Sequence, residues 1–343
     1  MKKILSVILA VLVIFTLSAC GTSQTPQTSV TPTQPASEPT KAPVNYPTKD
    51  ITYVVPYSAG GSSDQMARVI AKYAPKYLGV NMVIENIPGG AGNVGLVQFA
   101  GYKKDGYSIA SANTTMNLQP IYGTTEYDYI EIFEPIALVV SIPIAIAVPA
   151  NSPFQTIEEL IEYAKANPGK LQYGHAGIGS ITHVTAELFA MSADIKMTQV
   201  PFGSGNDALT ALLGGHIDID VASLSEVLSH HESGTVRILA MCTDVQVGDI
   251  PTLVSKGYDV DMKVTQGVCT HKGVDPEIIK ILDEGFRGIC TDPEFISELE
   301  SLGMDVDYLG AAEFSEFLQK QRKIFEEVVT ASGILEMVKS QQQ

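Results

Sequence analysis

The sequence has no tryptophan and little positive charge. Among its 343 residues, 22 are lysine or arginine and 38 are aspartate or glutamate, which gives a formal net charge of -16. Nucleic acid and anionic membrane surfaces are themselves negative, so this balance argues against either as a partner of the folded chain. The chain is nevertheless long enough to build two lobes, each with its own core.

Cysteine is also scarce, with one residue near the N-terminus and three further along, Cys242, Cys269 and Cys290. An exported protein could pair two of these three, but their number is odd and their spacing matches no metal-binding motif. We therefore predict buried free thiols. His230, His231 and Glu232 are adjacent in the chain, so their side chains would diverge on a helix. We predict exposed surface there, and we expect no metal site and no cofactor.

No apolar run is long enough to be a comfortable membrane span. Residues 4–17 are apolar and follow Lys2 and Lys3, which is typical of a signal-peptide core. The run ends in L-S-A-C-G, which resembles a bacterial lipoprotein cleavage box. This resemblance implies that residues 1–19 are a signal peptide and that Cys20 is lipidated. A plain signal peptide with an accidental cysteine is the alternative.

The next stretch, residues 20–45, is rich in serine, threonine, proline and glutamine. It has almost no large apolar side chain, so it cannot build a core, and we predict a flexible linker. The folded part then begins near Tyr46. Further along, the apolar residues 135–149 are interrupted by Pro143 and end at Pro149, which predicts one or two buried strands that cross between lobes.

The folded part is organised around residues 53–76, which predict a strand, a tight loop and a helix. Ser62 and Gln65 fit a capping box. The loop, residues 57–63, presents unpaired backbone N–H groups and the positive end of a helix dipole, which suits an anion. It has no lysine and no G-x-G-x-x-G pattern, so a nucleotide is not expected. A loop that is glycine-rich only for turn geometry is the alternative.

The same design recurs along the chain. Strands are predicted at residues 81–85 and 107–110, followed by a glycine loop at 86–95 and a loop of hydroxyl and amide side chains at 111–117. Residues 171–189 repeat the design with Ser180 as a helix cap, and residues 200–223 end in a strand that brings Ser223 to the same edge. The alternation predicts α/β lobes with largely parallel sheets, in which ligands lie beyond the carboxyl ends of the strands.

Six motifs in this order resemble one family. They are P-Y-S-A-G-G-S-S-D, E-N-I-P-G-G-A-G-N-V-G, D-G-Y-S, P-G-K-L-Q-Y-G-H-A-G-I-G-S, V-P-F-G-S and L-L-G-G-H-I-D. From about Tyr46 to the late 330s, the sequence resembles the substrate-binding proteins of tripartite tricarboxylate transporters, the Bug-type receptors. The motifs are specific for the family, and none of them specifies the ligand.

The resemblance implies an α/β fold of two lobes, of the periplasmic-binding-protein type II, each a mixed, mainly parallel sheet flanked by helices. Residues 46–140 and 265–343 would form lobe 1, and residues 141–264 would form lobe 2. It further implies a monomeric, non-enzymatic, extracytoplasmic receptor, tied to the bacterial cell membrane by its lipid. Such a receptor captures a small organic carboxylate by hinge closure and delivers it to membrane permease subunits.

The resemblance also implies ligand-binding positions, by motif. In lobe 1 these are Tyr57, Ser58, Ala59, Gly60, Gly61 and Asp64, and in lobe 2 they are Ala176, Gly177, Gly179 and Ser180. The loops and strand ends described above add to the predicted site Asn113, Thr114, Phe202, Ser204 and Ser223. Three features depart from the family: His175 and Gly203 replace a usual small residue and a common lysine, and T-Q-G-V-C at residues 265–269 lacks a frequent tryptophan.

Several roles stay open at this stage. Asp64 would either bind a ligand ammonium group or stabilise a helix N-terminus. His183 would either lie near the ligand or pack as a capping residue. A hydrolase using Ser180, His183 and Asp207 is a competing hypothesis, although Ser180 lacks the G-x-S-x-G elbow. A sensor with the same binding cleft is another.

Overall fold

The computed structural model describes residues 44–341 except 245 and 332, and Val44–Gln343 forms one compact unit. The predicted signal peptide, Cys20 and nearly all of the predicted linker lie outside the described residues, so those predictions remain untested. Among the helices of the described part, none has both the length and the hydropathy that crossing a membrane requires.

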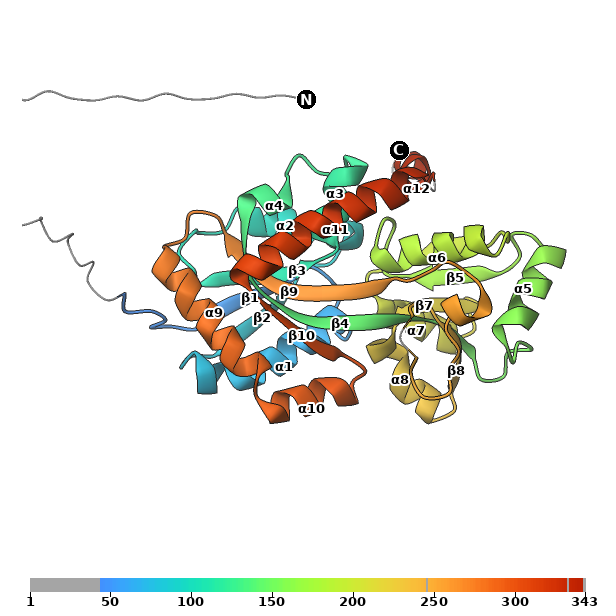
Figure 1. The fold of residues 1–343 in the computed structure, drawn as a ribbon, viewed down its shortest axis with the longest axis horizontal. Helices are drawn as coiled ribbons and strands as arrows, with labels where there is room; N and C mark the ends of the chain where they lie inside the picture. The colour runs from blue at the N-terminus through green and yellow to red at the C-terminus, as the bar shows by residue number, and fades with distance from the viewer. Residues whose placement is uncertain (1–43, 245, 332, 342–343) are drawn as a thin grey trace, which may run out of the picture. The chain divides into compact units, whose positions relative to one another are not determined.

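The described strands form one mixed sheet with two parts, which correspond to two lobes (Figure 1). The strands of lobe 1 are β1 Ile51–Val55, β2 Met82–Asn86, β3 Ser108–Asn113, β9 Lys263–His271 and β10 Asp305–Gly310. The strands of lobe 2 are β5 Gln172–His175, β6 Thr198–Pro201, β7 Ile219–Ser223 and β8 Val236–Met241. Parallel pairing joins β1 to β2 and β3, and β5 to β6 and β7; β8, β9 and β10 pair antiparallel.

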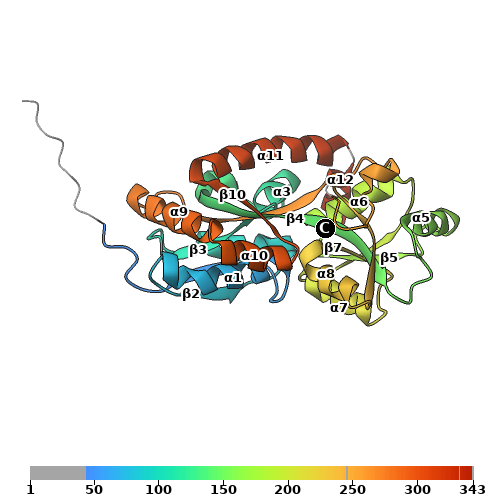
Figure 2. The ribbon, with the colours of Figure 1, turned by 60° about the horizontal axis from the view of Figure 1, so that its bottom comes forward.

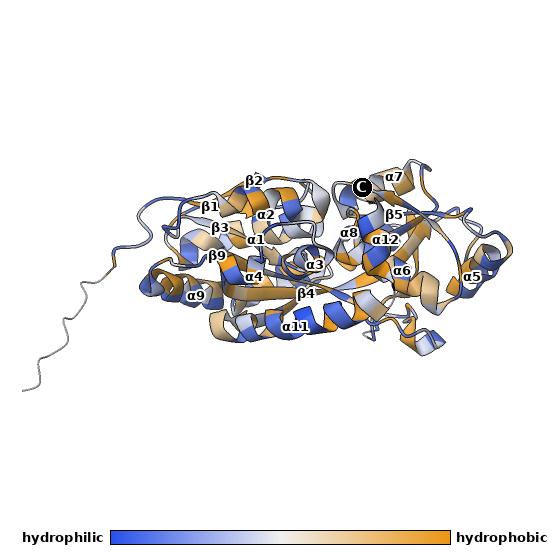
Figure 3. Cartoon of the chain, turned by 90° about the horizontal axis from the view of Figure 1, so that it is seen from above, coloured by the Kyte–Doolittle hydropathy of each residue, from blue (hydrophilic) through white to orange (hydrophobic). Residues whose placement is uncertain are grey.

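A single long strand, β4 Phe133–Pro149, belongs to both lobes. It pairs with β9 as far as Pro143, opposite Lys263, and with β7 from Ile144, opposite Ser223. Nearly all of its residues are buried, and Figure 3 shows it largely in the colours of apolar residues. The predicted apolar segment is therefore one continuous strand, and its partners change between Pro143 and Ile144. The predicted domain boundaries themselves remain a prediction.

Helices cover the sheet (Figures 1 and 2). Those associated with lobe 1 are α1 Ser62–Tyr77, α2 Asn93–Ala100, α3 Thr115–Tyr122, α4 Tyr129–Ile132, α9 Pro276–Cys290, α10 Pro293–Ser301, α11 Ala311–Ala331 and α12 Ile334–Gln341. Those of lobe 2 are α5 Ile157–Ala166, α6 Ile181–Ser192, α7 Gly205–Leu213 and α8 Leu224–Glu232. Two 3-10 turns, η1 Gly90–Gly92 and η2 Val254–Lys256, complete the described elements.

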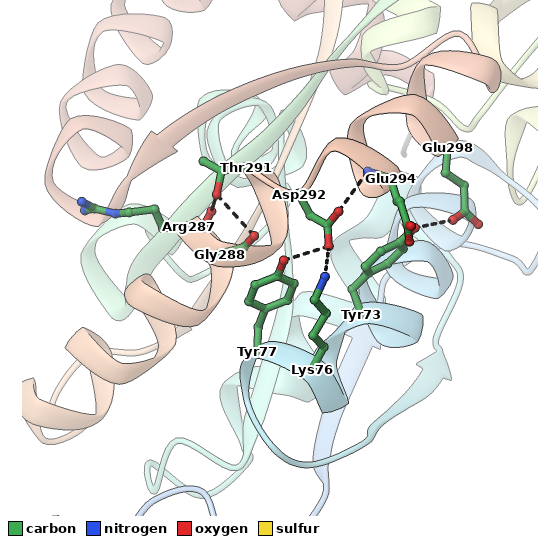
Figure 4. Close-up of polar contacts among 9 residues, drawn as sticks. All are labelled: Tyr73, Lys76, Tyr77, Arg287, Gly288, Thr291, Asp292, Glu294 and Glu298. Atoms are coloured by element: carbon green, nitrogen blue, oxygen red, sulfur yellow. Dashed lines mark hydrogen bonds and ion pairs between the residues drawn. The ribbon is translucent and has the colours of Figure 1, made fainter.

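The late helices are fastened to α1 by buried and half-buried polar contacts (Figure 4). Asp292 caps α10 by accepting a hydrogen bond from Glu294 N, and its other oxygen accepts from Lys76 Nζ at 2.7 Å and Tyr77 Oη at 2.8 Å. Lys76 and Tyr77 lower the pKa of Asp292 to about 2. One carboxylate thus starts a helix and ties it to the helix that follows the first loop.

Several local predictions can be compared with the structure. Cys242, Cys269 and Cys290 are free and buried, which confirms the prediction. The predicted loop at residues 111–117 is wrong, because β3 continues to Asn113 and α3 begins at Thr115. The predicted capping box at Ser62 is also wrong, since Ser62 is already helical and the cap position is Gly61. The backbone N–H of Ser62 donates instead to the side chain of Glu226, which is described below.

Candidate functional site

A small cavity lies where the two lobes meet, and residues of both lobes line it. Its lining residues are Tyr57, Gly61, Ser62, Ser63, Asn113, Thr114, Ala176, Ser180, Ile181, Thr182, Ser204, Gly205, Ser223, Glu226, Val264 and Gln266. The space open to the centres of water molecules is about 40 Å³, which is room for roughly three or four waters or one small solute. The cavity is therefore suited to a small molecule rather than to a polymer.

The starts of five helices converge on this cavity. Residues at or next to the N-termini of α1, α3, α6, α7 and α8 all contribute to its lining. Ser180 and Ser204 cap α6 and α7, where their hydroxyls accept hydrogen bonds from His183 N and Asp207 N, which confirms the prediction for Ser180. Each helix start brings partly unpaired N–H groups and a positive dipole end, so the cavity attracts negative charge without a basic side chain.

One acidic side chain already lies at this junction. Glu226 accepts a hydrogen bond from Ser62 N at 2.9 Å through Oε1 and from Ser223 N at 3.1 Å through Oε2. It forms the capping box of α8 and at the same time satisfies the start of α1 in the other lobe. Burial, and the nearby Asp207 to a smaller extent, raise the pKa of Glu226 to about 7.

Two amide groups in the lining have unused hydrogen-bonding capacity. Asn113 and Gln266 are buried, and neither Asn113 Nδ2 nor Gln266 Oε1 has a partner among the described residues. The rest of each amide is fixed: Asn113 Oδ1 accepts from Thr115 N, and Gln266 Nε2 donates to Ser62 Oγ at 3.0 Å. Both residues line the cavity, so a buried donor and a buried acceptor without partners lie in its wall, and a ligand with both kinds of group could satisfy them.

Beneath the lobe 2 loop lie two stacked histidines. The rings of His175 and His183 are 4.4 Å apart, and His183 Nδ1 accepts a hydrogen bond from Gly179 N at 3.0 Å. Burial lowers the pKa of His175 to about 4 and, together with the neighbouring His175, lowers that of His183 to about 3. Both rings are therefore neutral near pH 7. His183 packs under the loop and shapes it, and it does not line the cavity.

Asp64 makes contacts within its own lobe. Its carboxylate accepts hydrogen bonds from Gly60 N, Asn86 Nδ2 and Arg68 Nε. Burial alone would raise the pKa of Asp64, but these hydrogen bonds, with that from Arg68 the strongest, bring it below its usual value. The side chain stabilises the first loop and the start of α1, and it is not among the residues that line the cavity.

The structure divides the predicted site residues into two groups. Those that line the cavity are Tyr57, Gly61, Asn113, Thr114, Ala176, Ser180, Ser204 and Ser223. Those that lie outside its lining are Ser58, Ala59, Gly60, Asp64, Gly177, Gly179 and Phe202. Some members of the second group lie where the lobes approach each other. A Cβ at Gly203 would lie 2.8 Å from Ser58 Oγ, and a Cβ at Gly177 would lie 3.2 Å from the backbone of Ala91.

Sequence reasoning missed other lining residues, of which Glu226 and Gln266 are the most polar. Glu226 had a usable signal, because S-L-S-E at residues 223–226 is a capping-box pattern. Gln266 stands in the T-Q-G-V-C stretch that departs from the family, but nothing in the local sequence shows that β9 passes the cavity. Ser62 and Gly205 are neighbours of predicted residues.

The groups needed for hydrolysis are not assembled. Ser180 Oγ contacts Thr182 Oγ1, whereas Asp207 pairs with Ser204. His183 uses its Nδ1 to accept from the backbone, so the three residues form no chain of proton transfer. Within the described part of the chain, no three histidine, cysteine, aspartate or glutamate residues are grouped to hold a metal ion. His230 and His231 are half-buried and Glu232 is exposed.

The fold and the site define a class of protein: a two-lobed α/β receptor that encloses a small solute among helix N-termini. Comparison with known proteins identifies the family. Residues 66–334 match the model of the tripartite tricarboxylate transporter family receptor, and the chain belongs to this family. It is an extracytoplasmic solute-binding receptor of this transporter type.

Individual relatives agree with this assignment. A Cupriavidus necator protein named "UPF0065 protein in gbd 5'region" is 30% identical over 295 residues, which cover 84% of this chain and 90% of the relative. The solved periplasmic binding protein BugD is 28% identical with a TM-score of 0.81, covering 84% of this chain and 99% of BugD. An R. palustris protein solved with adipate is 25% identical with a TM-score of 0.81 and similar coverage, 84% and 99%.

Proposed function

We propose that this receptor binds a small organic carboxylate in the cavity between its lobes. The observation that carries the proposal is the convergence of helix N-termini on a cavity whose described lining includes no lysine or arginine. Backbone N–H groups, hydroxyls and the Asn113 amide supply donors for a carboxylate, and burial strengthens each hydrogen bond. Adipate in the R. palustris relative supports this ligand class.

Capture takes place by closure of the lobes around β4 and β9. The open form presents the helix starts of both lobes to solvent, and the ligand bridges them when the lobes close. No covalent step is required. Residues of the two lobes are in contact in this structure, with Ser58 beside Gly203 and Ser62 N donating to Glu226, and we expect opening of the lobes to break these contacts.

The ligand class is tested by isothermal titration of the full-length protein in mild detergent against carboxylates, sugars and inorganic phosphate. We expect binding of carboxylates. Asn113→Asp replaces the open donor by an oxygen and should weaken binding about tenfold or more, since a hydrogen bond to a charged group is lost and a repulsion is added. Asn167→Asp, outside the cavity, is the control. Binding of sugars or phosphate alone would contradict the proposal.

The receptor works at the outer face of the bacterial cell membrane, held there by a lipid on Cys20, and hands its ligand to permease subunits as a monomer. The signal-like N-terminus and the linker at residues 20–45 support the anchor. Labelling cells with a fatty-acid analogue tests it: Cys20→Ala should abolish labelling and release the protein from the membrane fraction. Uptake that continues unchanged when the receptor gene is deleted would contradict the transport role.

A further inference from the structure

We propose that Glu226 fills the anion position at the start of α1 and makes the receptor select a carboxylate that carries an ammonium group over a dicarboxylate. The inference rests on the proposed function and names the ligand class more closely. It concerns how the two ends of the ligand are bound. N–H donors bind the carboxylate end, and a carboxylate of the protein binds the ammonium end.

The first observation is that α1 is already supplied with an anion. Glu226 Oε1 accepts from Ser62 N at the start of α1, so this N–H is not available to a ligand carboxylate. Oε2 accepts from Ser223 N, so the same carboxylate also satisfies an N–H group at the start of α8. A second carboxylate cannot take these N–H groups without displacing Glu226. The starts of α3, α6 and α7, with Asn113 Nδ2, remain for one ligand carboxylate.

The second observation is that the backbone leaves a space for this carboxylate. A Cβ at Gly205 would collide with both oxygens of Glu226, and a Cβ at Gly61 would lie 3.4 Å from Oε1. The side chain therefore lies against two glycines, one from each lobe. Glu226 is also one of the residues that line the cavity, so a ligand within the cavity lies next to this side chain.

The third observation is the local charge. The charge of Asp207 acts on Glu226. Asp220 is a fully buried carboxyl without a hydrogen-bond partner among the described residues, and burial raises its pKa well above the ordinary value, which favours its neutral form, so the charges to be balanced are those of Glu226 and Asp207. No lysine or arginine stands among the described lining residues to balance them. A ligand ammonium beside Glu226 would supply the missing positive charge, and Gln266 Oε1 would accept a further hydrogen bond from it. A second ligand carboxylate would add repulsion instead.

The test uses ligands of equal length that differ at one end. Succinate and 3-aminopropanoate form one pair, and adipate and 5-aminopentanoate form another; each is titrated calorimetrically into the full-length protein in mild detergent. We expect the amino acid of at least one pair to bind about ten- to a hundredfold more tightly than its dicarboxylate, the range of a hydrogen bond between charged groups.

Variants assign this preference to Glu226. Glu226→Ala should reverse it, because the start of α1 then becomes available to the second carboxylate of succinate or adipate. Gly205→Ala should act in the same direction by displacing the side chain without removing it. Glu232→Gln, on the same helix but exposed, should leave the preference unchanged. Thermal unfolding of each variant shows whether it is folded.

The outcomes separate this inference from the proposed function. If the wild type prefers dicarboxylates, or if a folded Glu226→Ala variant keeps the preference for amino acids, the inference is wrong and the carboxylate receptor stands. If neither ligand of either pair binds and other carboxylates also fail, the proposed function is wrong and the inference falls with it. Reversal of the preference in Glu226→Ala, and its retention in Glu232→Gln, support both.

Discussion

At the scale of single residues, ionisable groups around the cavity are held in unusual states by burial. Glu226 is the clearest case, because two N–H donors favour its charged form while burial opposes it. The groups that face it are Asp207, Asp220 and Tyr57, none of which supplies a positive charge. A ligand that brings a positive charge therefore stabilises the charged form of Glu226 more than it would stabilise an exposed carboxylate.

Binding of an aminocarboxylate should consequently depend on pH. The pKa of Glu226 in the ligand-free protein is about 7, so the charged form that attracts an ammonium is lost as the pH falls below that value. We expect the affinity for 3-aminopropanoate to fall by up to about tenfold per pH unit between pH 7 and 5.5. The ligand itself does not titrate in this window. Titration calorimetry at several pH values should show the slope in the wild type and a flat profile in Glu226→Gln; a slope of equal size in both would exclude Glu226 as its source.

His183 should make the folded state sensitive to acid. Its pKa is about 3 in the folded protein, below the ordinary 6.5 expected after unfolding. The unfolded state therefore binds more protons between these values, and the stabilisation present above pH 6.5 is lost as the pH falls. Between pH 6.5 and 5 this loss is about 2 kcal/mol. His183→Asn can still accept from Gly179 N, so denaturant unfolding at both pH values should show a smaller loss in that variant.

At the scale of elements, helix starts decide most of the architecture of the site. The sequence identified several of them through serine caps, such as Ser180, and through glycine loops. It placed others wrongly, as at residues 111–117, because small polar residues suit both a loop and the end of a buried strand. Serine and threonine favour the start of a helix, but the residue at which the helix begins depends on where the preceding strand ends.

Asp292 gives a prediction for the joint between α1 and α10. Asp292→Asn retains a side chain that can cap α10 but loses the ion pair with Lys76, whereas Asp292→Ala loses both contacts (Figure 4). We expect the melting temperature to fall in the order wild type, Asn variant, Ala variant. The folded pKa of Asp292 is about 2, so the stabilisation is present above the ordinary aspartate pKa and is lost as the pH falls toward 2. Equal melting temperatures for all three proteins at pH 7 would contradict this reading, and ligand affinity should not change.

At the scale of the whole described body, few polar contacts cross between the lobes near the cavity. Glu226 with Ser62, and the hydroxyls of Ser223 and Ser62 at 3.3 Å, are two of them. Both join α1 to α8, while β4 and β9 connect the lobes at the back. The carboxylate of Glu226, which we propose binds the ammonium group of the ligand, therefore also stabilises the contact between the two lobes.

Removal of this carboxylate should open the ligand-free protein. Glu226→Ala takes away the acceptor that joins Ser62 N to α8, so small-angle X-ray scattering should give a larger radius of gyration than for the wild type. Adding a dicarboxylate should restore the compact value, because its second carboxylate then bridges the lobes. Glu232→Gln serves as the matched control. An unchanged radius in the ligand-free Glu226→Ala variant would show that Glu226 does not hold the lobes together.

The sequence by itself predicted most of the strand, loop and helix units as far as residue 223, the glycine loops at their junctions and the family, because each of these depends on residues close together in the chain. Only the tertiary structure decided what those loops meet. Ser62 and Glu226 are 164 residues apart, yet the N–H of one is satisfied by the carboxylate of the other. A local pattern shows that a helix start needs an anion, but whether the anion comes from the ligand or from the protein depends on packing between lobes, which no local pattern records.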